Sequence, residues 1–522
     1  MTKNRLKVLF VAYECAPFFK FGGLGDVAGS LPKALKELGV DIRVVMPYYR
    51  RVEKLGVVKL VKENIRLQIG DCRLEIGLYK SYLPGSSVPI YFIDNKKWFH
   101  VKHIFDKDEK ERFVLFSAIA GKLPEIIKWQ PDIIHGNDWQ TGLIPTITQK
   151  SKLKSQSCNS KPKTFNNERI RTIYTIHNLA YTGKTPLDIL EQYGFRREYF
   201  SGVDEKDSVN IMREAILAAD MINTVSPTYA KEILTKEYGA GMEDILKKRK
   251  KDLYGIVNGL DYGMFNPETD KAIKVRYEIK NIERKLDNKL YLQKINKLSI
   301  KPETPLIGMV TRLASQKGLD LMETIFDELM KEELQLVVLG SGSEYYESYF
   351  GKMNQKYRDK FRANLKFDVG LASQIYAGAD LFLMPSKYEP CGLGQLIAMK
   401  YGAVPIVRST GGLKDTVDGA EIEELNIDFN NQDTRYNNQK ITNNRFLIAV
   451  DGKFSITNIN KATGFSFEKY DAIDLLNTIR QALMVYQDQT AWRRLQINGM
   501  KQDWSWGKSA WEYLKLYQKS VN

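Results

Sequence analysis

Short apolar runs recur along the first half of the chain and alternate with stretches of helical periodicity. The runs lie at residues 7–14, 41–46, 132–135, 171–177 and 221–225. The first run is followed by glycines and then by a helical pattern over residues 26–38. Strand-like runs that alternate with helices are typical of a parallel sheet covered by helices.

A second series of strand-like runs begins near residue 304, after a charged segment of helical character over residues 271–301. It reads PLIGMVTR, LQLVVLGSG, DLFLMPS and VPIVRSTGG. We therefore predict an α/β protein of two doubly wound, Rossmann-like domains, residues 1–267 and 268–500, whose sheets face a shared cleft. Residues 501–522 are expected to form a helix that packs back on the first domain.

Two segments lack periodicity and the chain end is helical in pattern. Residues 151–167 are rich in Ser, Lys and Asn, residues 427–460 are rich in Asn, and both are predicted to be surface insertions. The helical pattern over residues 472–521 includes four of the seven tryptophans, which we interpret as packing anchors rather than a sugar-stacking platform. They are Trp492, Trp504, Trp506 and Trp511.

The composition, with 43% hydrophobic and 27% charged residues over 522 positions, indicates a folded protein of more than one domain. No apolar run approaches the roughly 18 residues that a membrane span requires. Four scattered cysteines without a C-x-x-C pair argue against a disulfide framework or a zinc site. We expect a cytoplasmic protein without a membrane partner.

The formal charge of +15 raises the question of a nucleic-acid partner. Part of the excess is local, in KKRKK at residues 247–251 and in residues 152–171. Because no nucleic-acid motif accompanies these runs, we interpret them as solvated basic faces and expect no nucleic-acid partner. Polyanion binding stays an alternative, which salt-resistant binding of RNA would support.

The first candidate site is the glycine-rich stretch KFGGLGD, which includes Lys20, Gly22 and Gly23. A helix that begins near Asp26 would offer unpaired N–H groups to an anion. Gly23-x-Gly25-x-x-Ala28 also matches a dinucleotide fingerprint, but the acidic residue expected after the next strand is replaced by Met46-Pro47. The stretch therefore favours a phosphate site, with Lys20 as the cation, over an NAD site.

The second and third candidate sites follow strands of the second domain. Arg312 and Lys317 lie five residues apart after one strand, where both cations can converge on a diphosphate. Glu389 lies in the turn EPCGLG, where a carboxylate can hold ligand hydroxyls, and a similar turn, STGG, follows the next strand. Neighbouring turns of this kind indicate a nucleotide-sugar pocket.

At this point the chain resembles a known family, the bacterial glycogen synthases and plant starch synthases. The motifs that carry the resemblance extend from about residue 7 to residue 517. They are KFGGLGDVAGSLPKAL, TIHNLAYTG, NTVSPTYAKEI, YGIVNGLDYGMFNP, VTRLASQKGLDL, YEPCGLGQLIAMKYG, STGGLKDTV, ATGFSF and DWSW.

The resemblance implies a GT-B glycosyltransferase that transfers glucose, with retention, from a nucleotide-glucose, typically ADP-glucose, to the non-reducing end of an α-1,4-glucan such as glycogen. It implies no metal and no cofactor beyond this donor substrate. It places His177, Arg312, Lys317 and Glu389 in catalysis. The residues that it implies at the donor are Lys20, Gly22, Gly23, Asp138, Cys391, Gly392, Leu393, Thr410, Gly411 and Gly412. Asn258 and Asp261 of VNGLD would shape an interdomain hinge.

The chain departs from the family pattern in its first domain. The usual motif H-x-H-D-W-H reads here His135-Gly-Asn137-Asp138-Trp-Gln140, so we assign no general base there. This change, together with the two insertions, motivates an alternative, a catalytically weakened glucan-binding scaffold. Ile397 replaces a second glutamate of the wider GT-B class, as is common in glycogen synthases.

A possible metal motif, the D-x-D pattern of Asp106 and Asp108, lies in the charged run DKDEKER. We interpret it as part of a solvated loop.

Overall fold

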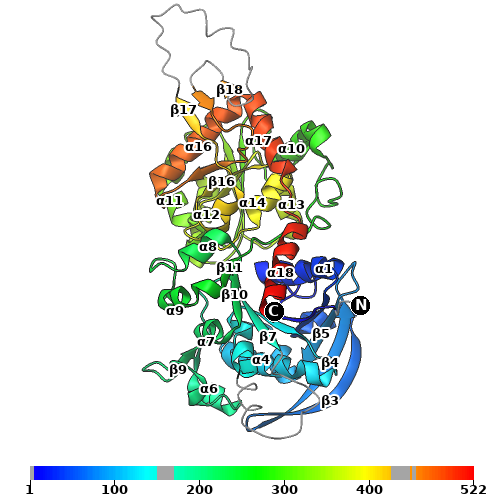
Figure 1. The fold of residues 1–522 in the computed structure, drawn as a ribbon. Coiled ribbons are helices and arrows are strands. Elements are labelled where there is room, and N and C mark those ends of the chain that lie inside the picture. Colours follow the sequence, from blue (N-terminus) through cyan, green and yellow to red (C-terminus); the bar gives the residue numbers. More distant parts are fainter. Residues whose placement is uncertain (1–4, 150–169, 425–446, 449–453) are drawn as a thin grey trace, which may run out of the picture. The chain divides into compact units, whose positions relative to one another are not determined.

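The computed structural model describes residues 5–149, 170–424, 447–448 and 454–522, and the chain divides into two compact units (Figure 1). Unit 1 comprises Met1–Gly259 and Ser505–Asn522, and unit 2 comprises Leu260–Trp504. The chain thus leaves unit 1 ahead of the expected residue 267 and returns to it after residue 500.

Hydrogen bonds explain where unit 2 begins and ends. The N–H of Leu260 donates to the carbonyl of Trp504 (2.6 Å), and the N–H of Trp504 donates to the hydroxyl of Tyr262 (2.8 Å). These hydrogen bonds join the first residues of unit 2 to its last residue. Of the two residues expected at a hinge, Asn258 is buried in unit 1, and Asp261 in unit 2 accepts the N–H of Gly263.

A nine-stranded sheet forms the centre of unit 1, in the order β11-β10-β7-β6-β1-β2-β5-β4-β3. The strands of unit 1, including the separate pair β8 and β9, are β1 (Lys7–Val11), β2 (Asp41–Pro47), β3 (Lys59–Ile69), β4 (Cys72–Tyr82), β5 (Pro89–Asp94), β6 (Ile133–Asn137), β7 (Arg171–Ile176), β8 (Lys184–Pro186), β9 (Ser208–Asn210), β10 (Met221–Thr224) and β11 (Leu253–Gly255). The large sheet is parallel except where β4 pairs with β3 and β5. Its parallel part confirms the five strands predicted from the apolar runs.

The antiparallel hairpin of β3 and β4 was not predicted. Most residues of β3 are exposed, so its sequence KLVKENIRLQI includes charged side chains where a buried strand would be apolar. The turn between the two strands is Gly70-Asp71, in which Gly70 has φ +58.

The helices of unit 1 surround this sheet. They are α1 (Gly23–Glu37), α2 (Arg50–Glu53), α3 (Lys96–Phe99), α4 (Glu109–Ile126), α6 (Leu187–Gln192), α7 (Ile211–Ala218), α8 (Pro227–Glu232), α9 (Glu243–Lys248) and α18 (Trp506–Val521). The last helix, α18, packs against α1 and β7, with Tyr513 and Tyr517 fully buried (Figure 1).

The basic run at residues 247–251 is only partly a solvated face. Arg249 donates from its guanidinium to the carbonyls of Ile216 (2.7 Å) and Ala219 (2.7 Å) at the end of α7 and also binds Asp252. A cation at the C-terminal end of a helix offsets the partial negative charge of the unpaired carbonyls. Arg249 is therefore a structural residue. Most of residues 152–171 lie outside the described residues.

A six-stranded parallel sheet, in the order β14-β13-β12-β15-β16-β20, forms the centre of unit 2, and a small antiparallel sheet adds β17, β19 and β18. The strands are β12 (Leu306–Val310), β13 (Gln335–Leu339), β14 (Phe361–Asn364), β15 (Leu381–Met384), β16 (Val404–Arg408), β17 (Ile422–Glu424), β18 (Leu447–Ile448), β19 (Phe454–Ile456) and β20 (Phe465–Phe467). The predicted insertion at residues 427–460 is wrong at its end, because β19 is a strand and Ile456 and Ile459 are buried. The rest of that insertion, except β18, and residues 151–167 lie outside the described residues.

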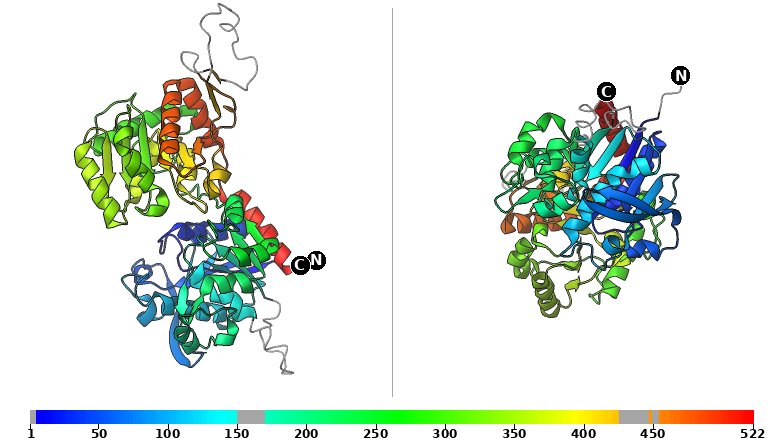
Figure 2. Two further views of the ribbon diagram at one scale, coloured as in Figure 1. Left: turned by 90° about the vertical axis from the view of Figure 1, so that its left-hand side faces the viewer. Right: turned by 90° about the horizontal axis from the view of Figure 1, so that it is seen from below.

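Helices cover both faces of the parallel sheet in unit 2 (Figure 2). Side chains alternate along β12, so Ile307 and Met309 join one apolar cluster with α11 and α16, and Leu306 joins another with α13 and α14. The helices are α10 (Lys285–Ile295), α11 (Leu319–Leu329), α12 (Glu344–Lys356), α13 (Val369–Gly378), α14 (Gly394–Lys400), α15 (Gly411–Thr416), α16 (Ala472–Gln487) and α17 (Gln489–Lys501). Across the described ranges, no helix of either unit is both long and apolar enough to cross a membrane.

The tryptophans near the chain end differ in burial. Trp492 packs between Phe465 and Tyr486, and Trp506 is also buried, as expected of packing anchors. The prediction is wrong for Trp511, which is 54% exposed.

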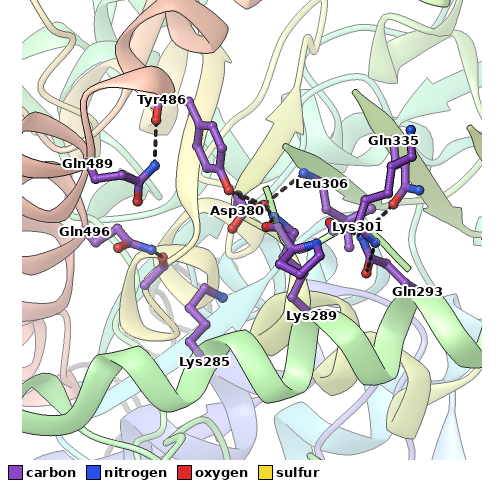
Figure 3. Close-up of polar contacts among 12 residues, drawn as sticks. Lys285, Lys289, Gln293, Lys301, Leu306, Gln335, Asp380, Tyr486, Gln489 and Gln496 are labelled. Atoms are coloured by element: carbon purple, nitrogen blue, oxygen red, sulfur yellow. Dashed lines mark hydrogen bonds and ion pairs between the residues drawn. The ribbon is translucent and has the colours of Figure 1, made fainter. Parts of the chain in front are cut away.

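Two buried lysines attach α10 to the rest of unit 2 (Figure 3). Lys289 Nζ lies 2.7 Å from Asp380 Oδ2 and also donates to the carbonyl of Pro302 (2.7 Å) and the hydroxyl of Tyr486 (2.9 Å). One turn earlier, Lys285 donates to the carbonyls of Tyr376 and Ala377 at the end of α13, and burial lowers the pKa of Lys285 to about 7.

We expect Asp380→Asn to lower the stability of unit 2 by about 3 to 5 kcal/mol, because Lys289 would keep a buried charge without its counter-ion. Glu333→Ala is the control, since Glu333 pairs at 4.0 Å with Lys360 on the surface and is 81% exposed. Its loss should cost about 1 kcal/mol or less. Urea unfolding followed by circular dichroism measures both variants, and equal midpoints would contradict the expectation.

Candidate functional site

In unit 1, the loop between β1 and α1 carries the first predicted cluster. Lys20 Nζ forms an ion pair with Asp26 Oδ2 at 2.7 Å, and the Lys20 side chain is 40% exposed. Gly22 precedes the helix and Gly23 begins it. A Cβ atom on Gly23 would meet nothing within 4 Å, so the backbone there is open to a ligand.

A buried carboxylate that sequence reasoning missed lies beneath this loop. Glu14 is fully buried, and its Oε2 accepts the N–H groups of Phe21 and of Gly22, the latter at 2.9 Å. Burial raises the pKa of Glu14, and the two N–H donors act in the opposite direction. These two N–H groups precede α1 and are bonded to the carboxylate of Glu14, so they are not free for an anion. The acid at the end of the apolar run KVLFVAYE, eight residues before the first glycine of the loop, was a usable signal.

Asp138 and His177 lie together at the ends of β6 and β7, which are neighbours in the sheet. Asp138 Oδ1 accepts the N–H groups of His177 (2.8 Å) and Asn178 (3.3 Å). Both Asp138 and His177 are partly exposed but closely surrounded by protein. Burial raises the pKa of Asp138 to about 7, against the two N–H bonds, and burial lowers the pKa of His177 to about 3.

The other residues of the motif that differs from the family pattern, His135, Asn137 and Gln140, are buried. Nδ1 and Nε2 of His135 lie 2.7 Å and 2.6 Å from the hydroxyls of Tyr517 and Thr175, so His135 attaches α18 to the sheet. The Asn137 amide contacts Nε2 of His177 at 2.9 Å. Gln140 is buried, and its carbonyl accepts the hydroxyl of Ser117.

In unit 2, β12, β15 and β16 are adjacent and parallel, so the turns after them meet at one edge of the sheet. Lys317 Nζ lies 2.6 Å from Glu389 Oε2, which also accepts the hydroxyl of Ser386 (2.9 Å). Both charged side chains of this pair are mostly buried. Arg312 is exposed, and no described residue pairs with its guanidinium.

The glycines of STGG allow this turn to touch the EPCGLG turn through their backbones. The N–H of Gly412 donates to the carbonyl of Glu389 (3.0 Å), and a Cβ atom on Gly412 would lie 2.1 Å from the carbonyl oxygen of Cys391. A Cβ atom on Gly411 would lie 2.0 Å from the carbonyl oxygen of Glu389. Of the other predicted residues, Cys391 and Thr410 are buried, Gly392 has φ +73, and Leu393 precedes α14.

The D-x-D motif is not simply a solvated loop. Both oxygens of the Asp106 carboxylate accept from Nη2 of Arg112 (2.9 Å each), and Arg112 is buried. Asp106 also accepts the N–H of Asp108 (3.0 Å). In the part of the chain that the structure describes, no cluster of three or more His, Cys, Asp or Glu side chains could hold a metal ion.

Known protein families and relatives match the chain over almost its whole length. The family described as "starch synthase catalytic domain" matches residues 7–248, and "glycosyl transferases group 1" matches residues 292–435. A glycogen synthase from Thermotoga petrophila is 42% identical over 525 residues, covering 99% of both chains. The chain belongs to the glycogen and starch synthase family. It is therefore a glycosyltransferase, which confirms the resemblance drawn from the motifs.

Solved structures place this glycogen synthase family member in the GT-B fold. The catalytic domain of starch synthase IV from Arabidopsis thaliana, bound to ADP and acarbose, is 30% identical and superposes with a TM-score of 0.83, covering 99% of both chains. A sucrose-phosphate synthase from Thermosynechococcus elongatus, 15% identical with a TM-score of 0.56, shares the fold. The predicted α/β fold with parallel sheets in two units is thus confirmed.

We expect Gly412→Ala to lower stability by about 1 to 3 kcal/mol and to reduce activity, because the new methyl group would push the two turns of unit 2 apart. Gly351→Ala is the matched control: Gly351 lies in α12, and a Cβ atom there would meet nothing within 4 Å. Alanine at that position should raise stability by up to about 1 kcal/mol. Thermal unfolding and turnover distinguish the two, and an unimpaired Gly412→Ala would contradict the backbone contact.

Proposed function

We propose that this protein transfers glucose from ADP-glucose to the non-reducing end of an α-1,4-glucan such as glycogen, with retention of configuration. Two kinds of evidence support the proposal. The family consists of glycogen and starch synthases, and the similar Arabidopsis starch synthase was solved with ADP and acarbose. The chain also has cationic side chains, Arg312 and Lys317, of the kind that can stabilise a departing diphosphate.

The observation that carries the proposal is the group of charges after β12 and β15. Arg312 keeps an exposed, unpaired guanidinium among the described residues, and Lys317 lies against Glu389. We propose that Arg312 binds phosphate oxygens with two N–H groups and that Lys317 neutralises the charge that develops as ADP departs. The carboxylate of Glu389 would accept hydroxyls of the donor sugar and keep Lys317 in place.

The turns beside these charges would hold the rest of the donor. Thr410, Gly411 and Gly412 would close the phosphate side, and Cys391, Gly392 and Leu393 would line the adjoining loop. Because the N–H of Gly412 already donates to the Glu389 carbonyl, its part is to bring the two turns together rather than to bind phosphate.

Unit 1 would contribute Lys20, Gly22 and Gly23 at the diphosphate, and His177 with Asp138 at the transferred glucose. A neutral His177 and a carboxyl group of Asp138 whose pKa is raised by burial are suited to hydrogen bonds with hydroxyls rather than to charge compensation. Since we assign no enzyme base, the acceptor hydroxyl would attack on the face from which the diphosphate departs and transfer its proton to a donor phosphate oxygen. No metal and no cofactor take part in this proposal, and the cytoplasmic location stays a prediction.

The first test is an assay of the purified protein with glycogen and either ADP-glucose or UDP-glucose. We expect elongation of the glucan with a higher kcat/KM for ADP-glucose, and an unchanged rate in excess EDTA. Nucleotide release and glucan length are measured together. Glucan binding without elongation by either donor would overturn the proposal in favour of a glucan-binding scaffold.

The second test is substitution of the two cations. We expect Arg312→Ala and Lys317→Ala each to lower kcat by about 10² to 10³, because each removes one electrostatic contact to the leaving group. Arg358→Ala and Lys352→Ala are matched controls, since both residues are exposed on unit 2 and lie outside the three turns. Thermal unfolding checks that the fold persists, and near-normal turnover in both test variants would contradict the assignment.

A further inference from the structure

The orientation of the Asn137 side chain is fixed by its partners. Asn137 is buried at the last position of β6, and its Nδ2 donates to the carbonyl of Val11 on β1 (3.0 Å). The opposite orientation would place the amide oxygen against that carbonyl, with two acceptors facing each other. The amide oxygen Oδ1 therefore faces Nε2 of His177, at 2.9 Å.

This contact determines which nitrogen of His177 carries the proton. An amide oxygen can only accept, so Nε2 of His177 must donate. Burial lowers the pKa of His177 to about 3, so the ring is neutral near pH 7 and Nδ1 has a free lone pair. No group in the described part of the chain hydrogen-bonds to Nδ1, and His177 is partly exposed. Nδ1 can therefore accept a hydrogen bond from a ligand.

The backbone of Asp138 allows two consecutive residues to hold His177. Successive side chains of a strand point to opposite faces. Asp138, however, has φ 55, in the left-handed region, directly after β6. Asn137 therefore holds the imidazole ring while Asp138 holds the N–H of His177 (2.8 Å). Both the ring and the backbone of His177 are fixed before any ligand binds.

We infer that Asn137 is a positioning residue that keeps His177 in the Nε2-protonated tautomer and so presents Nδ1 as a hydrogen-bond acceptor for a hydroxyl of the transferred glucose. The inference rests on the proposed place of His177 beside that sugar. In this arrangement Nε2 cannot act as a base. The asparagine at position 137, a departure from the usual motif, thus has a role of its own.

The tautomer can be observed directly, because the chain has only four histidines. In the full-length protein labelled with ¹⁵N-histidine, NMR at pH 8 should show His177 with a protonated Nε2 and a bare Nδ1. Asn137→Ala should give a mixture of tautomers, because it removes the oxygen that accepts from Nε2 of His177. Asn223→Ala is the matched control, since Asn223 is a buried asparagine on β10 that bonds Thr175 and Tyr513 but not His177. A wild-type His177 protonated at Nδ1 would overturn the inference.

A double-mutant cycle tests whether Asn137 acts through His177. Asn137→Ala should lower kcat/KM for ADP-glucose about tenfold, the effect of one hydrogen bond. In the His177→Ala background the same change should have little further effect, whereas a purely structural role would lower kcat/KM in both backgrounds. Full additivity would overturn the inference. If His177→Ala retains wild-type kcat/KM, the proposed place of His177 at the sugar is wrong, and so is its role as a hydrogen-bond acceptor for that sugar. The NMR spectra test the tautomer of His177 independently of this result.

Discussion

The parallel pairing of β12, β15 and β16 is the constraint on which the candidate site of unit 2 depends. Because these strands are neighbours, three turns far apart in sequence meet at one edge of the sheet. Their backbones touch only because glycines are present: a Cβ atom on Gly318 would lie 2.0 Å from the carbonyl oxygen of Pro385, and one on Gly412 would lie 2.1 Å from that of Cys391. The ion pair of Lys317 and Glu389 follows from this close approach.

The two units provide different electrostatic environments for a ligand. Unit 1 has two carboxyl groups whose pKa values are raised by burial, those of Glu14 and of the partly exposed Asp138, and a neutral His177. Its glycine loop is held in shape by the carboxylate of Glu14. Unit 2 has cations near its surface, Arg312 and Lys317. Unit 1 is therefore suited to hydrogen bonds with neutral hydroxyls, and unit 2 to compensation of phosphate charge.

The sequence was most informative where a strand is buried on both faces. Such strands are continuous apolar runs, and they were enough to predict the parallel sheets and the turns that follow the strands. The approach of Lys317 to Glu389, 72 residues apart, depends on the pairing of β12 with β15, which the runs alone did not predict. The exposed hairpin of β3 and β4 lacks such a run and was missed. The direction of single side chains could not be predicted either: the contact of Asn137 with His177 depends on the positive φ of Asp138, and the inward N–H groups of the glycine loop depend on the burial of Glu14. The contacts of Arg249 with the carbonyls at the end of α7 could not be predicted either, because the sequence shows only a basic run and not the direction of each side chain.

The chain end has a consequence for synthesis on the ribosome. Unit 2 is continuous in sequence, so it is complete once residue 504 has emerged, but unit 1 still lacks α18 at that stage. Until then, His135 and Asn223 in the interior of the large sheet have no tyrosine hydroxyls to bond, since those come from Tyr517 and Tyr513. Domains usually fold in order from the N-terminus as they are synthesised. Here the unit that is begun first is finished last, and its core closes only after the codons of α18 have been translated.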